Sequence, residues 1–344
     1  MAVRIGIDVM GGDDAPDAIL RGCIEALPKL NSDDVLVLIG PEDVINAFLK
    51  AEGVNDDRLV IEHCSEVIAM DASPMDAVRN KKDSTIVRMS VLGSKKAEVR
   101  CDAVISAGNT GACVAAGQMN MRRLPGVHRP GIAVTIPSFH GPVTLCDAGA
   151  NPEPRATHLW QYGLMAEVYA NRIHGVENPR VGVMNIGSEE SKGSGLAKGT
   201  AELLRNTPGV NFVGFVEGRD FFAGKADVIV TDGFLGNTLL KMAEGMAKSL
   251  FQAIATEIYQ QDPALAVKFE PVVKSIYAKN DYHEHGGAPL LGVNGVMMIA
   301  HGSSESRTIK NAIAKTIEYV NGGINDAIIE RLDQAEKALQ GELA

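Results

Sequence analysis

The chain has 344 residues, of which 45% are apolar and 22% charged, a composition of packed globular proteins that excludes a largely disordered chain. Its 33 Lys and Arg against 43 Asp and Glu residues give a formal net charge of −10, which argues against nucleic-acid binding, because that function normally needs a basic surplus. The five cysteines are scattered and form no C-x-x-C pair, and the sequence shows no export signal and no apolar run long enough to span a membrane. These features indicate a protein of the reducing cytosol.

Short β-branched runs recur along the chain and alternate with helical or irregular segments. The expected strands are 3–7, 35–39, 103–106, 143–145, 181–185, 228–231 and 296–299. Helices are expected over 155–174, 237–259 and 306–339, the last interrupted at Gly322-Gly323. Apolar residues spaced by three and four support the second helix, for which Asn237 is the expected N-cap. This alternation predicts an α/β fold with a largely parallel sheet.

Polar loops that contain glycine follow the expected strands. They occupy 8–13, 40–43, 107–111, 147–151, 186–190, 232–237 and 301–304. Because the carboxyl ends of parallel strands share one edge of a sheet, we expect these loops to line a single crevice that favours anions. Tight turns in any α/β protein also use Gly, Asn and Asp, so it is the number of such loops that favours a site.

Several familiar motifs are missing. There is no P-loop and no G-x-S-x-G elbow, and in 193–199 the third glycine of a G-x-G-x-x-G motif arrives one residue late. His283 and His285 lie in a polar stretch that favours a structural role over a metal site. Cys113 and Cys146 follow strand-end patterns, but free cysteines are more often buried apolar residues than nucleophiles. We therefore expect no cofactor and no metal.

Taken together and in this order, the loops resemble the PlsX family of phosphate acyltransferases. The matching stretches are 7–16, 77–85, 104–112, 147–151, 185–193, 216–220, 232–237 and 286–304, with Asp14 and His285 in place of the family's Asn and Tyr. The resemblance implies a doubly wound α/β fold with helices on both faces of the sheet, like isocitrate dehydrogenase and phosphotransacetylase. It also implies one catalytic unit over 1–344 with an indistinct division into two lobes. Its expected activity is transfer of a fatty acyl group from acyl carrier protein to inorganic phosphate for phospholipid synthesis.

Phosphate is already anionic near neutral pH and a thiol leaves readily, so this reaction needs positioning and oxyanion stabilisation more than a strong base. The resemblance makes Lys192, Asp232 and His301 the catalytic candidates. The residues expected to bind phosphate or substrate are Asp8, Asp13, Arg79, Lys82, Asn109, Thr110, Asn151, Asn185, Gly187 and Asn237. Alternatives remain open: Lys192 as a surface lysine paired with Glu189 or Glu190, Asp232 as a helix cap, and His301 as a loop-packing residue.

The resemblance also implies a homodimer, an acyl carrier protein partner steered by local basic segments, and peripheral membrane contact close to a membrane-bound glycerol-3-phosphate acyltransferase. Residues 259–282 mix apolar side chains with lysines and are the candidate membrane- or partner-contacting segment. Pro263 and Pro271 are expected to break this segment, and an ordinary buried hairpin or a dimer contact is the alternative. The acyl chain would lie near Met242, Met246 and 263–277, unless these belong to the core. The alternative functions are an NAD(P)-dependent dehydrogenase, a phosphotransacetylase acting on acyl-CoA and a membrane-surface scaffold.

Overall fold

The computed structural model describes residues 2–138, 140–280 and 286–341, and within them a single sheet crosses the molecule. The strand order is β3-β2-β1-β4-β11-β10-β5-β6-β9-β7-β8. The strands are β1 (Arg4–Asp8), β2 (Val35–Gly40), β3 (Leu59–His63), β4 (Ala103–Ser106), β5 (Gly131–Ile136), β6 (Val143–Cys146), β7 (Arg180–Met184), β8 (Asn211–Val216), β9 (Val228–Val230), β10 (Ala288–Leu291) and β11 (Val296–Ile299).

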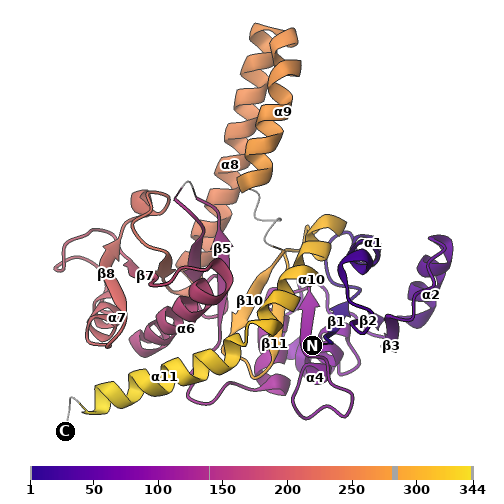
Figure 1. Cartoon of the computed structure of the whole chain (residues 1–344), viewed down its shortest axis with the longest axis horizontal. Coiled ribbons are helices and arrows are strands. Elements are labelled where there is room, and N and C mark those ends of the chain that lie inside the picture. Colours follow the sequence, from indigo (N-terminus) through magenta and orange to yellow (C-terminus); the bar gives the residue numbers. More distant parts are fainter. Residues whose placement is uncertain (1, 139, 281–285, 342–344) are drawn as a thin grey trace.

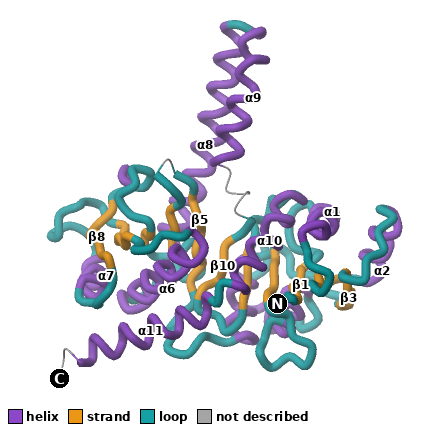
Figure 2. The backbone as a smooth tube through the Cα atoms, viewed as in Figure 1, coloured by secondary structure: helices purple, strands orange, loops and turns teal. Residues whose placement is uncertain are grey.

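Helices connect the strands and cover both faces of the sheet (Figure 2). They are α1 (Asp17–Ala26), α2 (Glu42–Ala51), α3 (Pro74–Asn80), α4 (Thr85–Leu92), α5 (Thr110–Ala116), α6 (Ala156–His174), α7 (Gly195–Arg205), α8 (Gly233–Gln261), α9 (Pro263–Asn280), α10 (Ser306–Asn321) and α11 (Ile324–Gly341). Short 3₁₀ turns lie at Leu27–Lys29 and Gly218–Asp220, and a π-helical turn at Gly117–Met121 extends α5.

The sheet consists of two parallel halves that run in opposite directions. Strands β3, β2, β1, β4 and β11 are parallel to one another, as are β6, β9, β7 and β8. Between the halves, β10 pairs antiparallel with both β11 and β5, and β5 pairs antiparallel with β6. The carboxyl ends of the two halves therefore face opposite edges. The expectation that all strand-end loops share one edge is wrong, because these antiparallel pairings reverse the strand direction.

Each half of the sheet carries its own helices and forms a lobe (Figure 1). In the first lobe α1 and α10 pack together on one face, while α3, α4 and α5 pack on the other. In the second lobe α6, α7 and α11 share one core, in which the Trp160 indole donates a hydrogen bond to Thr207 Oγ1 over 2.8 Å. Helix α11 follows α10 of the first lobe directly but packs against α6 of the second. The C-terminal segment thus ties the two lobes together.

Many of the expected elements are confirmed. The strands predicted at 35–39, 103–106 and 296–299 and the helix at 155–174 lie within a residue of β2, β4, β11 and α6, and Gly322-Gly323 separates α10 from α11. The helix expected over 237–259 begins earlier, at Gly233, and its N-cap is Asp232 instead of Asn237. Strands β3, β5, β8 and β10 are not among the predicted strands, although β5 and β8 contain β-branched and aromatic runs.

Helices α8 and α9 form a hairpin that projects away from both lobes (Figure 1). The expected break at Pro263 is confirmed, because α8 ends at Gln261 and α9 begins at Pro263, whereas the break expected at Pro271 is wrong, because α9 continues through it. Met242 and Met246 are 61% and 67% exposed, which excludes the interpretation that they are core residues of this chain. Phe269 is also exposed, so the segment is not a buried hairpin of the monomer. Among the described residues, no helix is long and apolar enough to cross a bilayer.

Candidate active site

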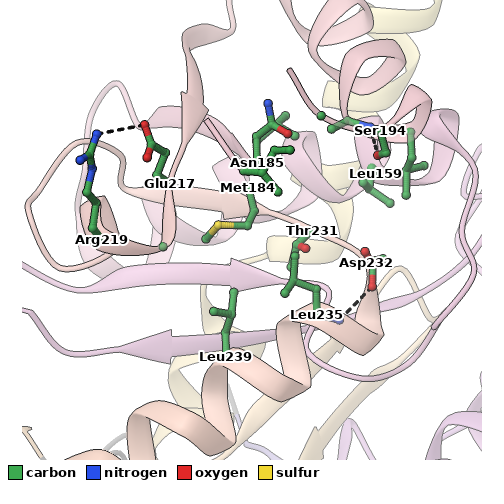
Figure 3. Close-up of a pocket in the computed structure, with 16 residues that line it drawn as sticks. Leu159, Met184, Asn185, Ser194, Glu217, Arg219, Thr231, Asp232, Leu235 and Leu239 are labelled. Carbon is green, nitrogen blue, oxygen red and sulfur yellow. Dashed lines mark hydrogen bonds and ion pairs between the residues drawn. The ribbon is translucent and has the colours of Figure 1, made fainter. Parts of the chain in front are cut away.

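Two hollows flank the first turns of α8, and residues of this helix line both. The interlobe cleft has a volume of about 380 Å³ and lies over the central strands between the lobes. Its lining includes Asp13, Met70, Thr110 and His301 from the first lobe, Asn237, Lys241 and Glu244 from α8, and Ile132, Val134, Ala288 and Ile299 from the sheet. The strand-edge pocket, of about 680 Å³, belongs to the second lobe and lies at the carboxyl ends of β7, β8 and β9 (Figure 3).

Buried polar residues hold the first-lobe wall of the cleft. Asp8, at the end of β1, accepts hydrogen bonds from Ser106 Oγ over 2.7 Å and from the Met10 amide over 3.2 Å. Ser106 in turn accepts from the Gly108 amide over 3.0 Å, so one carboxyl group connects the loops after β1 and β4. Burial raises the pKa of the Asp8 carboxyl, and the Ser106 hydrogen bond partly opposes that rise.

Asn109, in the loop after β4, also holds the first-lobe wall of the cleft in place. Its Oδ1 accepts the Ala112 amide over 3.0 Å and so caps α5, while its Nδ2 lies 3.0–3.2 Å from the carbonyl oxygens of Ala69, Met70 and Ala72. The side chain is only 6% exposed. Asn109 therefore positions Met70 and Thr110, which line the cleft, and its polar atoms are already occupied within the chain.

A second buried carboxyl group supports the opposite wall. Asp147 follows β6 and accepts hydrogen bonds from the amides of Ile132, Ala150 and Asn151 at 2.6–3.0 Å. Burial raises the pKa of Asp147, and these amides partly offset the effect. A side chain at Gly236 would overlap the Asp147 carbonyl oxygen, so glycine is what allows α8 to lie directly on this loop. That contact sets the position of the α8 residues that face the cleft.

The strand-edge pocket has a mostly apolar lining with polar groups at its rim. Leu159, Val183, Leu196, Leu235 and Leu239 provide apolar surface, and Asn185, Ser194, Glu217, Arg219 and Asp232 provide the polar groups (Figure 3). Asp232 Oδ1 accepts the Leu235 amide over 2.9 Å, which makes it the cap of α8. Asn185 Nδ2 donates to the carbonyl oxygens of Gly187 and Lys192 over 3.0 and 3.3 Å and so closes the loop after β7.

The residues selected from the sequence thus divide into four groups. Asp13, Thr110, His301 and Asn237 meet in the interlobe cleft, whereas Asn185 and Asp232 line the strand-edge pocket. Asp8, Asn109 and Asn151 are buried behind the cleft and hold its loops, with Asn151 donating to Tyr162 Oη and the Pro130 carbonyl over 2.7 Å. Arg79, Lys82, Gly187 and Lys192 line neither hollow.

Lys192 forms an ion pair with Glu189 over 2.8 Å and is 51% exposed. No hydrogen bond or ion pair joins it to Asp232 within the part of the chain that the structure describes, although their loops follow the adjacent strands β7 and β9. His301 Nδ1 lies 2.8 Å from Ser303 Oγ, which orients the ring at the cleft. The histidines at 283 and 285 lie outside the described residues.

Lys241 and Glu244 are cleft residues that the loop-based sequence reasoning missed. Both lie on α8, one and two turns beyond Asn237, so they share its face at spacings of four and three. The helical period was visible in the sequence, but it does not indicate which face meets a cavity.

The two-lobed α/β architecture is a phosphotransacetylase-like fold. A phosphotransacetylase from Streptococcus pyogenes superposes with a TM-score of 0.58 at 16% identity, covering 97% of this chain and 94% of that one. A branched-chain phosphotransacylase from Enterococcus faecalis superposes with a TM-score of 0.57 at 13% identity, covering 92% of this chain and 99% of that one.

Sequence comparison gives the family. A family model described as "Fatty acid synthesis protein" matches residues 3–327. The phosphate acyltransferase of Heliobacterium modesticaldum is 44% identical over 333 residues, covering 96% of this chain and 98% of the relative. That of Desulfitobacterium hafniense is 43% identical over 335 residues, with 96% and 98% coverage. The chain belongs to the phosphate acyltransferase family.

Proposed function

We propose that the enzyme transfers a fatty acyl group from acyl carrier protein to inorganic phosphate and releases acyl phosphate for phospholipid synthesis. A phosphate oxygen attacks the thioester carbonyl carbon, the C–O bond forms, and the C–S bond breaks to release the carrier thiol. The observation that carries this proposal is the interlobe cleft, which places a lysine, a histidine, a hydroxyl and an amide side chain around one space. These are groups for binding an anion and stabilising an oxyanion.

The cysteines give no support to a covalent acyl-enzyme. Cys113 and Cys146 are completely buried, and burial raises the pKa of the Cys113 thiol to about 12. The thiolate is the nucleophilic form, so such a thiol is inert near neutral pH. Direct attack by phosphate needs no protein nucleophile, in keeping with the cleft's composition.

Lys192 and Asp232 remain the proposed catalytic pair. Lys192 is bound only to a neighbouring surface carboxylate, and such exposed pairs contribute about 0–1 kcal/mol, so the lysine can exchange Glu189 for a substrate anion at little cost. Asp232 is held by its capping bond at the start of α8 and lines the strand-edge pocket, which the first turns of α8 separate from the interlobe cleft. Both residues follow strands of the same parallel half of the sheet.

The test is to incubate the purified chain with palmitoyl-acyl carrier protein and phosphate and to measure acyl phosphate and free thiol. We expect turnover, with much lower rates in Lys192→Ala and in Asp232→Asn, which retains a capping side chain. Lys50→Ala, on the exposed surface of α2, serves as the control. Equal turnover with palmitoyl-CoA would instead favour an acyl-CoA phosphotransacetylase, and near wild-type rates in both variants would remove the catalytic assignment.

The exposed hairpin suits the proposed homodimer and peripheral membrane contact. Met242, Met246, Leu250 and Ile254 recur every four residues along α8, and Phe269 and Ile276 are exposed on α9. Contiguous exposed apolar surface of this kind marks an interaction site. We propose that a second copy covers the α8 stripe, that α9 contacts the bilayer near a membrane-bound glycerol-3-phosphate acyltransferase, and that acyl carrier protein docks beside the cleft.

A further inference from the structure

Helix α8 brings two oppositely charged side chains into the interlobe cleft. Lys241 is the only Lys or Arg among the described residues that line this cleft. Glu244 follows three residues later and is half-buried. No ion pair joins the two residues or connects either to another described side chain. The cleft therefore contains one lysine and, besides Asp13, a glutamate, and the charges of Lys241 and Glu244 are not neutralised by each other.

One oxygen of the Glu244 carboxylate lacks a hydrogen-bond partner. Its Oε1 atom is buried and has no hydrogen-bond partner within the described part of the chain. A buried polar atom without a partner costs roughly 1–3 kcal/mol, so such atoms are generally satisfied by protein, water or ligand. Oε1 has no accessible surface, so a ligand in the cleft reaches this carboxylate at its other oxygen, Oε2. Since a carboxylate can only accept, such a ligand must be a hydrogen-bond donor.

The other polar groups of the cleft limit what that donor can be. Across the cleft are Thr110, His301 and the carboxylate of Asp13, while Asn237 lies beside Lys241 on α8. An anion can bind to Lys241 and accept from the hydroxyl, amide and imidazole groups. If it carries a proton of its own, it can also donate to Glu244. An anion without a proton would instead place an oxygen lone pair against the carboxylate.

We propose that Lys241 and Glu244 together form an anion-selectivity element that accepts inorganic phosphate and rejects sulfate. Near neutral pH phosphate retains at least one P–OH proton, whereas sulfate retains none, although the two ions have nearly the same size and shape. Lys241 binds a charged phosphate oxygen, and Glu244 accepts the P–OH proton in a hydrogen bond. A site built to accept a hydrogen bond discriminates strongly against a ligand that lacks the donor. This inference rests on the proposed function, in which phosphate is the acyl acceptor.

The experiment measures anion binding without any acyl donor. The apparent Kd values of phosphate and sulfate come from thermal stabilisation of the full chain at matched ionic strength, at pH 7. The variants are Glu244→Gln, which has nearly the same shape but replaces an acceptor oxygen with an NH₂ donor, and Lys241→Gln. Glu257→Gln and Lys248→Gln are the matched controls, because both residues are exposed on α8 beyond the cleft.

For the wild type we expect phosphate to bind at least ~10-fold more tightly than sulfate, which corresponds to the loss of one hydrogen bond to a charged group. Glu244→Gln should reduce this ratio by about 10-fold, because its amide can donate to sulfate. Lys241→Gln should weaken both anions by about 10-fold and leave their ratio in place. Both controls should behave as the wild type.

An unchanged ratio in Glu244→Gln would overturn the proposal, as would equal binding of the two anions by the wild type. A variant that alters only the oligomeric state would assign Glu244 to the contact between copies and would also overturn it. The proposed function is separable: selective phosphate binding without acyl phosphate formation refutes the activity, whereas acyl phosphate formation without selectivity refutes this inference alone.

Discussion

Replacing Asn109 should loosen the first-lobe wall of the cleft without touching a group that contacts substrate. Its amide nitrogen faces the carbonyl oxygens of Ala69, Met70 and Ala72, and its oxygen caps α5 through the Ala112 amide. Asn109→Ala removes both functions. Asn109→Asp retains the cap but places a second acceptor against three carbonyl oxygens.

The expected loss follows from these contacts. A lost N-cap costs about 1 kcal/mol, and the two Nδ2 protons contribute about 1 kcal/mol each as buried hydrogen bonds. Asn109→Ala should therefore lower the free energy of unfolding by about 3 kcal/mol. Asn109→Asp should lose about 2 kcal/mol or more, because its cap survives while its carboxylate is buried without a donor.

Urea unfolding followed by circular dichroism gives these free energies, and steady-state kinetics gives the functional consequence. Since Met70 and Thr110 line the cleft, we expect a raised KM for phosphate in both variants. A loss below about 0.5 kcal/mol in Asn109→Ala, which is typical of an ordinary surface substitution, would refute the positioning role. Full stability in Asn109→Asp with activity abolished would instead identify Asn109 as a residue that contacts substrate.

Three further outcomes are expected. Cys113→Ser and Cys146→Ser should retain turnover, because burial raises the pKa of both thiols; an acyl adduct seen by intact-protein mass spectrometry with acyl donor alone would contradict this. The double variant Phe269→Glu, Val273→Glu should lose flotation with anionic liposomes but retain its oligomeric state and activity in solution, whereas unchanged flotation would exclude α9 as the membrane contact. Hydrogen bonds from the Arg58 side chain lower the pKa of Asp56 to about 2, so its small stabilisation is present above pH 4 and lost as the pH falls toward 2. Asp56→Asn should accordingly cost well under 1 kcal/mol at pH 7, with the difference from wild type disappearing in acid urea titrations.

Local patterns in the sequence were sufficient to predict most of the strands and helices that support the site. The apolar runs of β2 and β4 are continuous because both faces of these strands are buried, and a long apolar run is a strong signal. Strand β5 has a comparable run over Gly131–Ile136, but neither β5 nor β10 indicates its neighbours in the sheet. They are adjacent in the sheet through Leu290 and Ile132, which are separated by more than 150 residues in the chain, and a sequence pattern carries no information on such pairing.

The order of motifs along the chain was sufficient to recognise the family, because several collinear loops are far more specific than any one of them. Their sequence also placed Asp13, Thr110, His301 and Asn237 among the candidates that meet in the cleft. The sequence did not distinguish these four cleft residues from Asn109 and Asn151, which are buried behind the cleft. The same residue type binds a ligand when exposed and holds a loop when buried, and burial is a property of the packed structure.

Only the tertiary structure decided where the site lies. Three successive antiparallel pairings, β11–β10, β10–β5 and β5–β6, reverse one half of the sheet. The strand-end loops therefore do not share one edge; loops from both halves line the interlobe cleft, and others line the strand-edge pocket. The amphipathic period of α8 was evident from the sequence, yet it could not show that Lys241 and Glu244 face the opposite lobe. Periodicity determines which side chains share a helix face. What that face meets depends on how the lobes pack, and here that depends on contacts between residues distant in sequence.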